Sequence, residues 1–167
     1  MRSLATLVTT FALALSGLIL SPASAETVSC IGGTFTIDSG VVTDGSNCTG
    51  VVVIPEGATS IGDSAFYNAT SLTSINIPAS VTSVGKWSFS NATSLNTITF
   101  ASGSKLASIG KFAFENATAL TSITIPASVT SIASYAFGSC YSLTSAVFLG
   151  DAPVLDVNDV FESAAEG

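Results

Sequence analysis

The sequence lacks histidine and carries little positive charge. Its 167 residues include no His, and four Lys plus Arg stand against eleven Asp plus Glu, for a formal net charge of -7. Without His, and with Arg2 as the single arginine, Ser-His-Asp and Cys-His catalysis, His-ligated metals and arginine phosphate clamps are excluded. Nucleic acids and anionic membrane surfaces are disfavoured as partners, because so few cations cannot neutralise them. We therefore expect no enzyme, no catalytic residues, no cofactor and no metal site.

Only one long apolar run occurs, and it lies at the start of the chain. Residues 4–20 are apolar, Arg2 precedes them, and residues 22–25 are Pro-Ala-Ser-Ala, which ends in the small-residue pattern of a cleavage site. This order predicts a signal peptide over residues 1–25. The alternative, an uncleaved anchor helix, would be short and is interrupted by polar residues. We expect a secreted or cell-surface protein that does not insert in the membrane after cleavage.

Three cysteines are present, and their positions suggest two different roles. Cys30 and Cys48 flank a segment rich in Gly, Thr and Asp, so in an oxidising compartment they are the natural disulfide pair. A loop of this length would stabilise the fold by about 3 kcal/mol. Cys140 is left over, and we expect it to be a small buried apolar side chain, with a reactive thiol as the alternative.

Comparison of the chain with itself reveals four repeats with a period of 23 residues. The units span residues 54–76, 77–99, 100–124 and 125–147. The third unit contains two extra residues around Gly103 and Ser104, and residues 148–161 resemble a degraded fifth unit. A unit of this length cannot bury its own apolar face, so the units must stack as a solenoid.

The apolar positions predict how the units stack. Alternation over residues 74–77 predicts a strand with one buried face, and equivalent strands would form a parallel sheet along the molecule. Proline follows this strand in three units, at Pro55, Pro78 and Pro126. The core rows are expected to be Leu72, Leu95, Leu120 and Leu143; Ile61, Val84, Ile109 and Ile132; and Phe66, Phe89, Phe114 and Phe137. The spacing of Ile61, Ala65, Phe66 and Ala69 predicts a short helical turn on the opposite side.

These repeats carry a family resemblance. Units of the form Ile-Pro-Ala-Ser-Val-Thr-Ser-Ile-Gly, then Ala-Phe, then Ala-Thr-Ser-Leu-Thr-Ser-Ile resemble the BspA-like leucine-rich repeat family of bacterial and protist surface proteins, over residues 54–150. The usual Cys of that family is replaced by Ala69, Ala92 and Ala117 and is retained only as Cys140. The resemblance implies a leucine-rich-repeat solenoid with an extracellular binding or adhesion role and no catalytic residues.

Both ends of a solenoid need caps, because stacking stops there. Residues 26–53 are predicted to form an N-terminal β cap, with a hairpin of Thr34–Ile37 and Val41–Val42 held by the proposed disulfide. Residues 148–167 are predicted to form a degraded repeat, a C-terminal cap and a tail. An incomplete cap here would allow end-to-end self-association.

An aromatic stripe is the candidate binding site. Trp87, Phe112 and Tyr135 occupy the same repeat position, and Lys86 and Lys111 precede two of them. Exposed aromatic residues beside isolated charges are typical of interface anchors and sugar platforms. The alternative interpretation is that these rings pack under the neighbouring unit and complete the edge of the core.

Two further patterns leave alternatives open. Asn at positions 47, 68, 91 and 116 is followed two residues later by Thr, the acceptor pattern for N-glycosylation. The structural alternative is that these Asn side chains satisfy backbone groups where each turn ends. Regular Ser and Thr rows on the sheet, such as Thr97, Thr99 and Thr124, offer many hydrogen bonds and no pocket.

The favoured function is binding or adhesion to an extracellular protein or glycan. Its expected contacts are the aromatic stripe and the two lysines beside it. The alternatives are a structural remnant of a larger surface protein, and ice or crystal-surface binding by the Ser and Thr rows.

Overall fold

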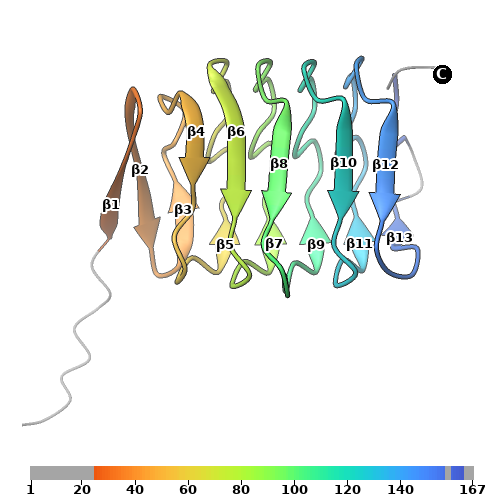
Figure 1. Ribbon diagram of the computed structural model, residues 1–167, viewed down its shortest axis with the longest axis horizontal. Coiled ribbons are helices and arrows are strands. Elements are labelled where there is room, and N and C mark those ends of the chain that lie inside the picture. Colours follow the sequence, from red (N-terminus) through yellow and green to blue (C-terminus); the bar gives the residue numbers. More distant parts are fainter. Residues whose placement is uncertain (1–24, 157–158, 164–167) are drawn as a thin grey trace, which may run out of the picture.

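The protein is a β-solenoid, in which each repeat makes one coil and successive coils lie side by side (Figure 1). This computed structural model describes residues 25–156 and 159–163. The predicted signal peptide lies outside the described residues except for Ala25, and so does the end of the predicted tail. Within the described part of the chain, no helix has the length and apolarity needed to cross a membrane.

Two sheets run along opposite sides of the solenoid, and we call them the front sheet and the back sheet (Figure 1). The front sheet contains β4 (Gly50–Val53), β6 (Leu72–Ile77), β8 (Thr97–Phe100), β10 (Ser122–Ile125) and β12 (Ser145–Phe148). The back sheet contains β1 (Glu26–Cys30), β2 (Gly33–Asp38), β3 (Val41–Thr43), β5 (Ser60–Ile61), β7 (Ser83–Val84), β9 (Ser108–Ile109), β11 (Ser131–Ile132) and β13 (Val154–Leu155), in that order. Adjacent coils pair in parallel, as the repeat predicts.

The predicted core rows are buried between the two sheets. Leu72, Leu95, Leu120 and Leu143 are at most 4% exposed, and Phe66, Phe89, Phe114 and Phe137 are 0% exposed. Neighbouring rings of this phenylalanine column stack with centroids 5.1, 5.1 and 5.2 Å apart and planes within 5° of parallel. Because parallel strands lie about 4.8 Å apart, equivalent rings on successive coils are brought into stacking distance.

Close approach of the coils also depends on glycine at the corner that follows β5, β7 and β9. A Cβ atom on Gly85 would lie 2.7 Å from backbone atoms of Gly62 and Asp63. A Cβ atom on Gly110 would meet the backbone of Gly85 at 2.8 Å. The glycine column therefore sets how tightly the backbones of the first three repeats pack.

The prediction of short helical turns is wrong. The structure places consecutive non-helical turns there, for example over residues 63–68. Their backbone N–H groups alternate between two directions: Ala65 donates to the carbonyl of Gly62 in its own coil (3.3 Å), whereas Phe66 donates to the carbonyl of Ser88 in the next coil (2.7 Å). An α-helix bonds successive N–H groups to carbonyls four residues earlier in the same segment, so alternate donation to the neighbouring coil prevents it.

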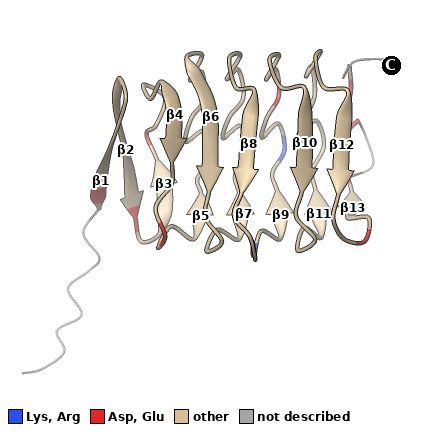
Figure 2. Cartoon of the chain, in the orientation of Figure 1, with Lys and Arg blue, Asp and Glu red and all other residues tan. Residues whose placement is uncertain are grey.

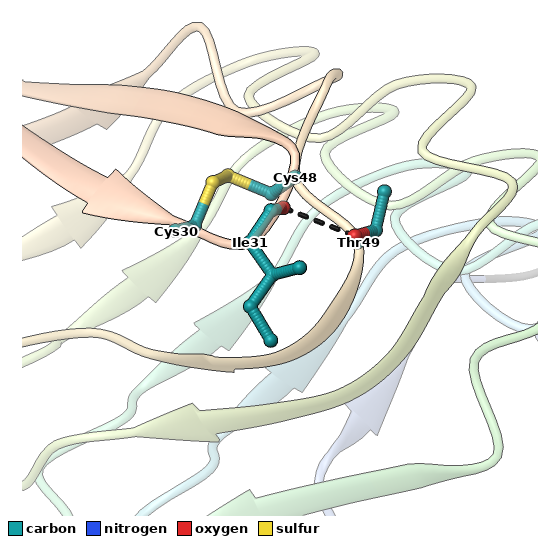
Figure 3. Close-up of a disulfide and its surroundings, with 4 residues drawn as sticks. All are labelled: Cys30, Ile31, Cys48 and Thr49. Atoms are coloured by element: carbon teal, nitrogen blue, oxygen red, sulfur yellow. Dashed lines mark hydrogen bonds between the residues drawn. A yellow bond between two sulfur atoms is a disulfide. The ribbon is translucent and has the colours of Figure 1, made fainter.

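An antiparallel hairpin of β2 and β3 covers the first coil, and β1 adds a strand that the sequence pattern did not predict. Phe35 of β2 is buried and its ring lies 6.0 Å from that of Phe66, so it closes the phenylalanine column. Figure 3 shows the disulfide between Cys30 and Cys48, which confirms the predicted pair. Beside it, the Thr49 hydroxyl donates to the carbonyl of Ile31 (3.1 Å).

The front sheet is interrupted between β8 and β10. Strands β4, β6 and β8 form one ladder, and β10 and β12 form another, whereas the back sheet is continuous from β7 through β9 to β11. Figure 1 shows the wider spacing of β8 and β10. The interruption coincides with the turn after β8, where Gly103 and Ser104 make the third repeat longer.

One buried hydroxyl departs from the repeat and yields a stability prediction. Ser88 is 0% exposed and its hydroxyl lacks a hydrogen-bond partner among the described residues, while its equivalents are Ala65, Ala113 and Ala136. We expect Ser88→Ala to raise the free energy of unfolding by about 1 kcal/mol, because it removes an unsatisfied buried polar group. Chemical denaturation measures the change.

The matched control is Ser128→Ala, because the Ser128 hydroxyl donates to the carbonyl of Leu106 (2.7 Å). Its loss should lower the free energy of unfolding by about 1 kcal/mol. Equal effects of the two substitutions would contradict the conclusion that the Ser88 hydroxyl is unpaired.

Candidate functional site

The aromatic stripe of Trp87, Phe112 and Tyr135 lies in the turns that follow β7, β9 and β11. Trp87 stacks on Phe112 with centroids 5.8 Å apart and planes 6° apart, and Phe112 stacks on Tyr135 at 5.3 Å and 20°. Trp87 is 37% exposed, and the other two rings are half-buried. The structure therefore brings the three predicted rings together as a column that remains accessible at its surface.

The backbone of this column is left-handed, which is unusual for aromatic residues. The φ angles of Trp87, Phe112 and Tyr135 are 54°, 59° and 56°. Ser64 and Asp159, which occupy the same repeat position, have φ of 58° and 61°. The fold thus needs a left-handed residue here in every coil, and the small or polar residues at the two ends satisfy that need at lower cost. The backbone does not explain why three coils carry rings.

The two predicted lysines lie over the rings that follow them. Lys86 Nζ is 3.8 Å from the Trp87 ring centroid, and Lys111 Nζ is 4.8 Å from that of Phe112. Each cation–π contact is worth roughly 0.5 to 1 kcal/mol at an exposed site. The backbone N–H of Lys86 also donates to a carboxylate oxygen of Asp63 (2.8 Å). These contacts hold the cations against the aromatic stripe.

Acidic residues surround the other end of the stripe. The carboxylates of Glu162 and Asp159, together with burial and a hydrogen bond to Glu162, raise the pKa of the Tyr135 phenol. Tyr135 therefore keeps its proton to higher pH than a free tyrosine, and it can donate a hydrogen bond. The stripe runs from cation-covered rings at Trp87 and Phe112 to an acid-flanked phenol.

A shallow cleft of about 350 Å³ adjoins the Trp87 end of the stripe. Its lining consists of Ser64, Tyr67, Trp87, Ser90, Asn91 and Glu115, from three successive coils. The Ser90 hydroxyl donates to Glu115 Oε2 (3.2 Å), and Asn116 Nδ2 donates to Asn91 Oδ1 (2.7 Å). Sequence reasoning missed Tyr67 and Glu115, and it gave Asn91 only a glycosylation or backbone role. Tyr67 is 41% exposed and has Ser90, Glu115 and Gly138 as its repeat equivalents, so no aromatic row marks it.

The asparagines of the turns have a clear conformational role. Asn68, Asn91 and Asn116 have φ of 58°, 61° and 57°, and Asn tolerates this left-handed backbone better than most residues. Ser139, with φ of 55°, holds the same position in the fourth repeat, so the turn favours Asn there without requiring it. The side chains of Asn91 and Asn116 bond to each other, which differs from the predicted bonds to backbone groups.

The front-sheet surface offers polar rows that are irregular. Thr97, Thr99 and Thr124 are exposed as predicted. However, Val53 and Val147, which lie in the row of Thr99 and Thr124, are 60% and 48% exposed. Such apolar interruptions give no support to a regular crystal-binding lattice.

Cys140 is 0% exposed, and its thiol donates a hydrogen bond to the carbonyl oxygen of Phe114 (3.2 Å). Burial, with a smaller contribution from nearby Glu115, raises the pKa of the Cys140 thiol to about 12, against a backbone hydrogen bond that lowers it. A thiol with this pKa contains almost no thiolate at neutral pH.

No group of three or more His, Cys, Asp or Glu able to hold a metal is found within the described residues.

We expect iodoacetamide to leave Cys140 unmodified at pH 8 in the native protein and to modify it in 6 M guanidinium, as measured by mass spectrometry. Because folding raises this pKa, the associated stabilisation is present at neutral pH and is lost as the pH rises from about 9 toward 12. A Cys140→Ala variant has no thiol to ionise, so its free energy of unfolding should fall less over this pH range. Rapid native labelling would show that the thiol is accessible and reactive.

A second prediction separates a structural role of Trp87 from a binding role. Left-handed backbone costs an aromatic residue roughly 1 to 2 kcal/mol, while a ring stack returns about 0.5 to 1.5 kcal/mol. The two effects nearly cancel, so Trp87→Asn should change the free energy of unfolding by less than about 1 kcal/mol. Denaturant titration followed by circular dichroism measures this.

The control for that experiment is Phe89→Ala, because Phe89 is 0% exposed in the phenylalanine column. It should cost about 3 to 5 kcal/mol. A loss of similar size for Trp87→Asn would identify the stripe as the edge of the core.

Comparisons with known proteins agree with the geometry. The model for the BspA type leucine rich repeat region matches residues 42–163 in six copies, two more than the four full repeats identified in the sequence. No curated protein sequence matches the chain significantly.

Several solved structures share the fold. A leucine-rich repeat protein from T. pallidum is 28% identical with a TM-score of 0.66, over 73% of this chain and 58% of that protein. One from Bacteroides capillosus is 29% identical with a TM-score of 0.57, over 74% of this chain and 99% of that one. A leucine-rich cell surface protein from Faecalibacterium prausnitzii is 26% identical with a TM-score of 0.50, over 77% of this chain and 44% of that protein.

Proposed function

The chain belongs to the BspA-type leucine-rich repeat family, and we propose that it is an exported binding protein whose aromatic stripe docks an extracellular protein. The single observation that carries this proposal is the stripe itself. Three stacked rings lie in left-handed positions that the fold fills with Ser64 and Asp159 in other coils. Stacking offsets much of the cost of this backbone, and partly exposed aromatic rings that are held in a fixed array are suited to contact with a partner.

The chemistry of the stripe suits a protein interface. Aromatic residues are the typical hot spots of such interfaces, and charged groups at the rim contribute orientation. Lys86 and Lys111 supply cations in a protein that is otherwise acidic, while Asp159 and Glu162 supply acids at the opposite end. The charge changes sign along the stripe, which would fix the direction of a bound partner. A glycan is the alternative ligand of this surface.

Export is supported by three independent features. A disulfide joins Cys30 and Cys48, and disulfides persist in oxidising compartments. The apolar run and small residues of positions 1–25 fit a signal peptide. The structural relative from Faecalibacterium prausnitzii is described as a cell surface protein.

The test measures binding of the purified protein to an array of extracellular matrix and serum proteins. The triple variant Trp87→Ala, Phe112→Ala, Tyr135→Ala should lose binding about 30-fold, since hot-spot truncations cost about 2 kcal/mol or more. Trp87 is the single tryptophan, so the partner should also alter its fluorescence emission in the unmodified protein.

Two controls make the result decisive. Circular dichroism and denaturant titration must show that the triple variant is folded. The double variant Thr97→Ala, Ser122→Ala alters the front-sheet surface and should bind normally. Binding that survives in the folded triple variant, or the absence of any partner for the unmodified protein, would overturn the proposal.

A further inference from the structure

The interruption between β8 and β10 opens a cleft of about 490 Å³ at the surface of the front sheet. Core-facing side chains are uncovered there: Ile98 and Phe100 are half-buried, although their equivalents Ile75 and Ile77 are at most 1% exposed. Thr99 and Thr124 also line the cleft, together with Leu149, which is 64% exposed. The cleft therefore combines an apolar surface with exposed hydroxyl groups.

Strands β8 and β10 do not pair with each other. No ladder of backbone hydrogen bonds joins the facing edges of β8 and β10, whereas β6 pairs with β8 and β10 pairs with β12 along four residues each. Buried or half-buried N–H and C=O groups require partners. A peptide strand does not fit between the two strands, because Cα atoms of β8 and β10 approach within 8 Å and an inserted strand needs about 9.6 Å.

The cleft is uncharged. Among the described residues, no Lys, Arg, Asp or Glu lines it, and the strands from β3 to β13 carry no charged side chain (Figure 2). Hydroxyl groups of Thr99, Ser102 and Thr124 lie on exposed residues, and the Phe100 ring offers an apolar contact. A saccharide ring has a complementary set of groups, since it presents hydroxyls at its edge and C–H groups on its faces.

A second hollow extends the cleft along the solenoid. It measures about 290 Å³, shares Thr99 and Ala101 with the cleft, and continues to Val53 of β4. The combined groove crosses the ends of successive strands, so it fits a chain better than a single ring. Glu56 lines its far end and would repel an anionic ligand.

We propose that this groove, which spans the interruption between β8 and β10, binds a neutral oligosaccharide. Two extra residues, Gly103 and Ser104, lengthen the turn that coincides with the opening. The site is separate from the aromatic stripe, so it neither requires nor excludes the proposed protein partner.

Isothermal titration calorimetry with four neutral pentasaccharides, maltopentaose, cellopentaose, laminaripentaose and chitopentaose, tests the proposal, with an oligogalacturonate as the anionic probe. At least one neutral probe should bind, and the oligogalacturonate should bind at least about tenfold more weakly. Thr99→Lys places a charge in the groove and should weaken binding about tenfold or more. Thr97→Lys changes an exposed residue of the same strand outside the lining and is the matched control.

Deletion of Gly103 and Ser104 provides a second variant. It restores the 23-residue spacing, so it should close the cleft and reduce binding about tenfold or more without lowering the thermal midpoint. Trp87→Asn should bind the saccharide normally, and saccharide should leave the emission of Trp87 unchanged. These two readouts distinguish this site from the aromatic stripe.

Three results would overturn the proposal: no binding of any neutral probe, equal binding by the folded Thr99→Lys and Thr97→Lys variants, or binding that survives the deletion. Loss of saccharide binding in Trp87→Asn would place the saccharide on the aromatic stripe and would also contradict the proposal that the groove binds it.

Discussion

Stacking of equivalent coils at the spacing of a parallel β-ladder is the interaction on which the rest of the structure depends. A 23-residue coil is too small to enclose its own apolar side chains, so Leu, Ile and Phe become buried only against the same residues of the next coil. The ladder spacing of about 4.8 Å places equivalent phenylalanine rings 5.1 to 5.2 Å apart. The glycine column at Gly62, Gly85 and Gly110 permits this spacing where the backbones come closest.

The same spacing produces the aromatic stripe outside the core. Rings placed at one repeat position must stack on one another, whether they face inward, as Phe89 does, or outward, as Trp87 does. The two columns differ in what holds them. The inner rings are buried in the core, whereas the outer rings stand on left-handed backbone, with lysines over Trp87 and Phe112 and acidic residues beside Tyr135. The repeat therefore provides both a core and an accessible, ordered surface.

Departures from the period create the surfaces that differ along the solenoid. Ser64 ends the stripe, and Tyr67 and Glu115 make the hollow beside it distinct from every other coil. The longer third repeat coincides with the interruption of the front sheet, yet the back sheet and the phenylalanine column continue past it. The solenoid tolerates a local irregularity because each coil contacts only its neighbours. The groove thus arises where the repeat is least regular, whereas the aromatic stripe follows the repeat and ends where its residues change.

Much of the architecture followed from the sequence alone, because the periodic apolar residues allow one way of being buried. Periodicity predicted the parallel sheet and the rows of Leu72 and Phe66, and cysteine position predicted the disulfide. Apolar spacing also predicted helical turns, wrongly, because side-chain spacing does not reveal that Phe66 donates its N–H to the next coil. The cleft between β8 and β10, the extra strand β1 and the left-handed backbone of Trp87 were decided only by the tertiary structure. The cleft and the left-handed turn of Trp87 depend on which main-chain groups pair between coils, and those partners lie too far apart in sequence for a local pattern to specify them. Strand β1 instead pairs with the adjacent β2, but its residues are mostly exposed and carry no strong apolar pattern.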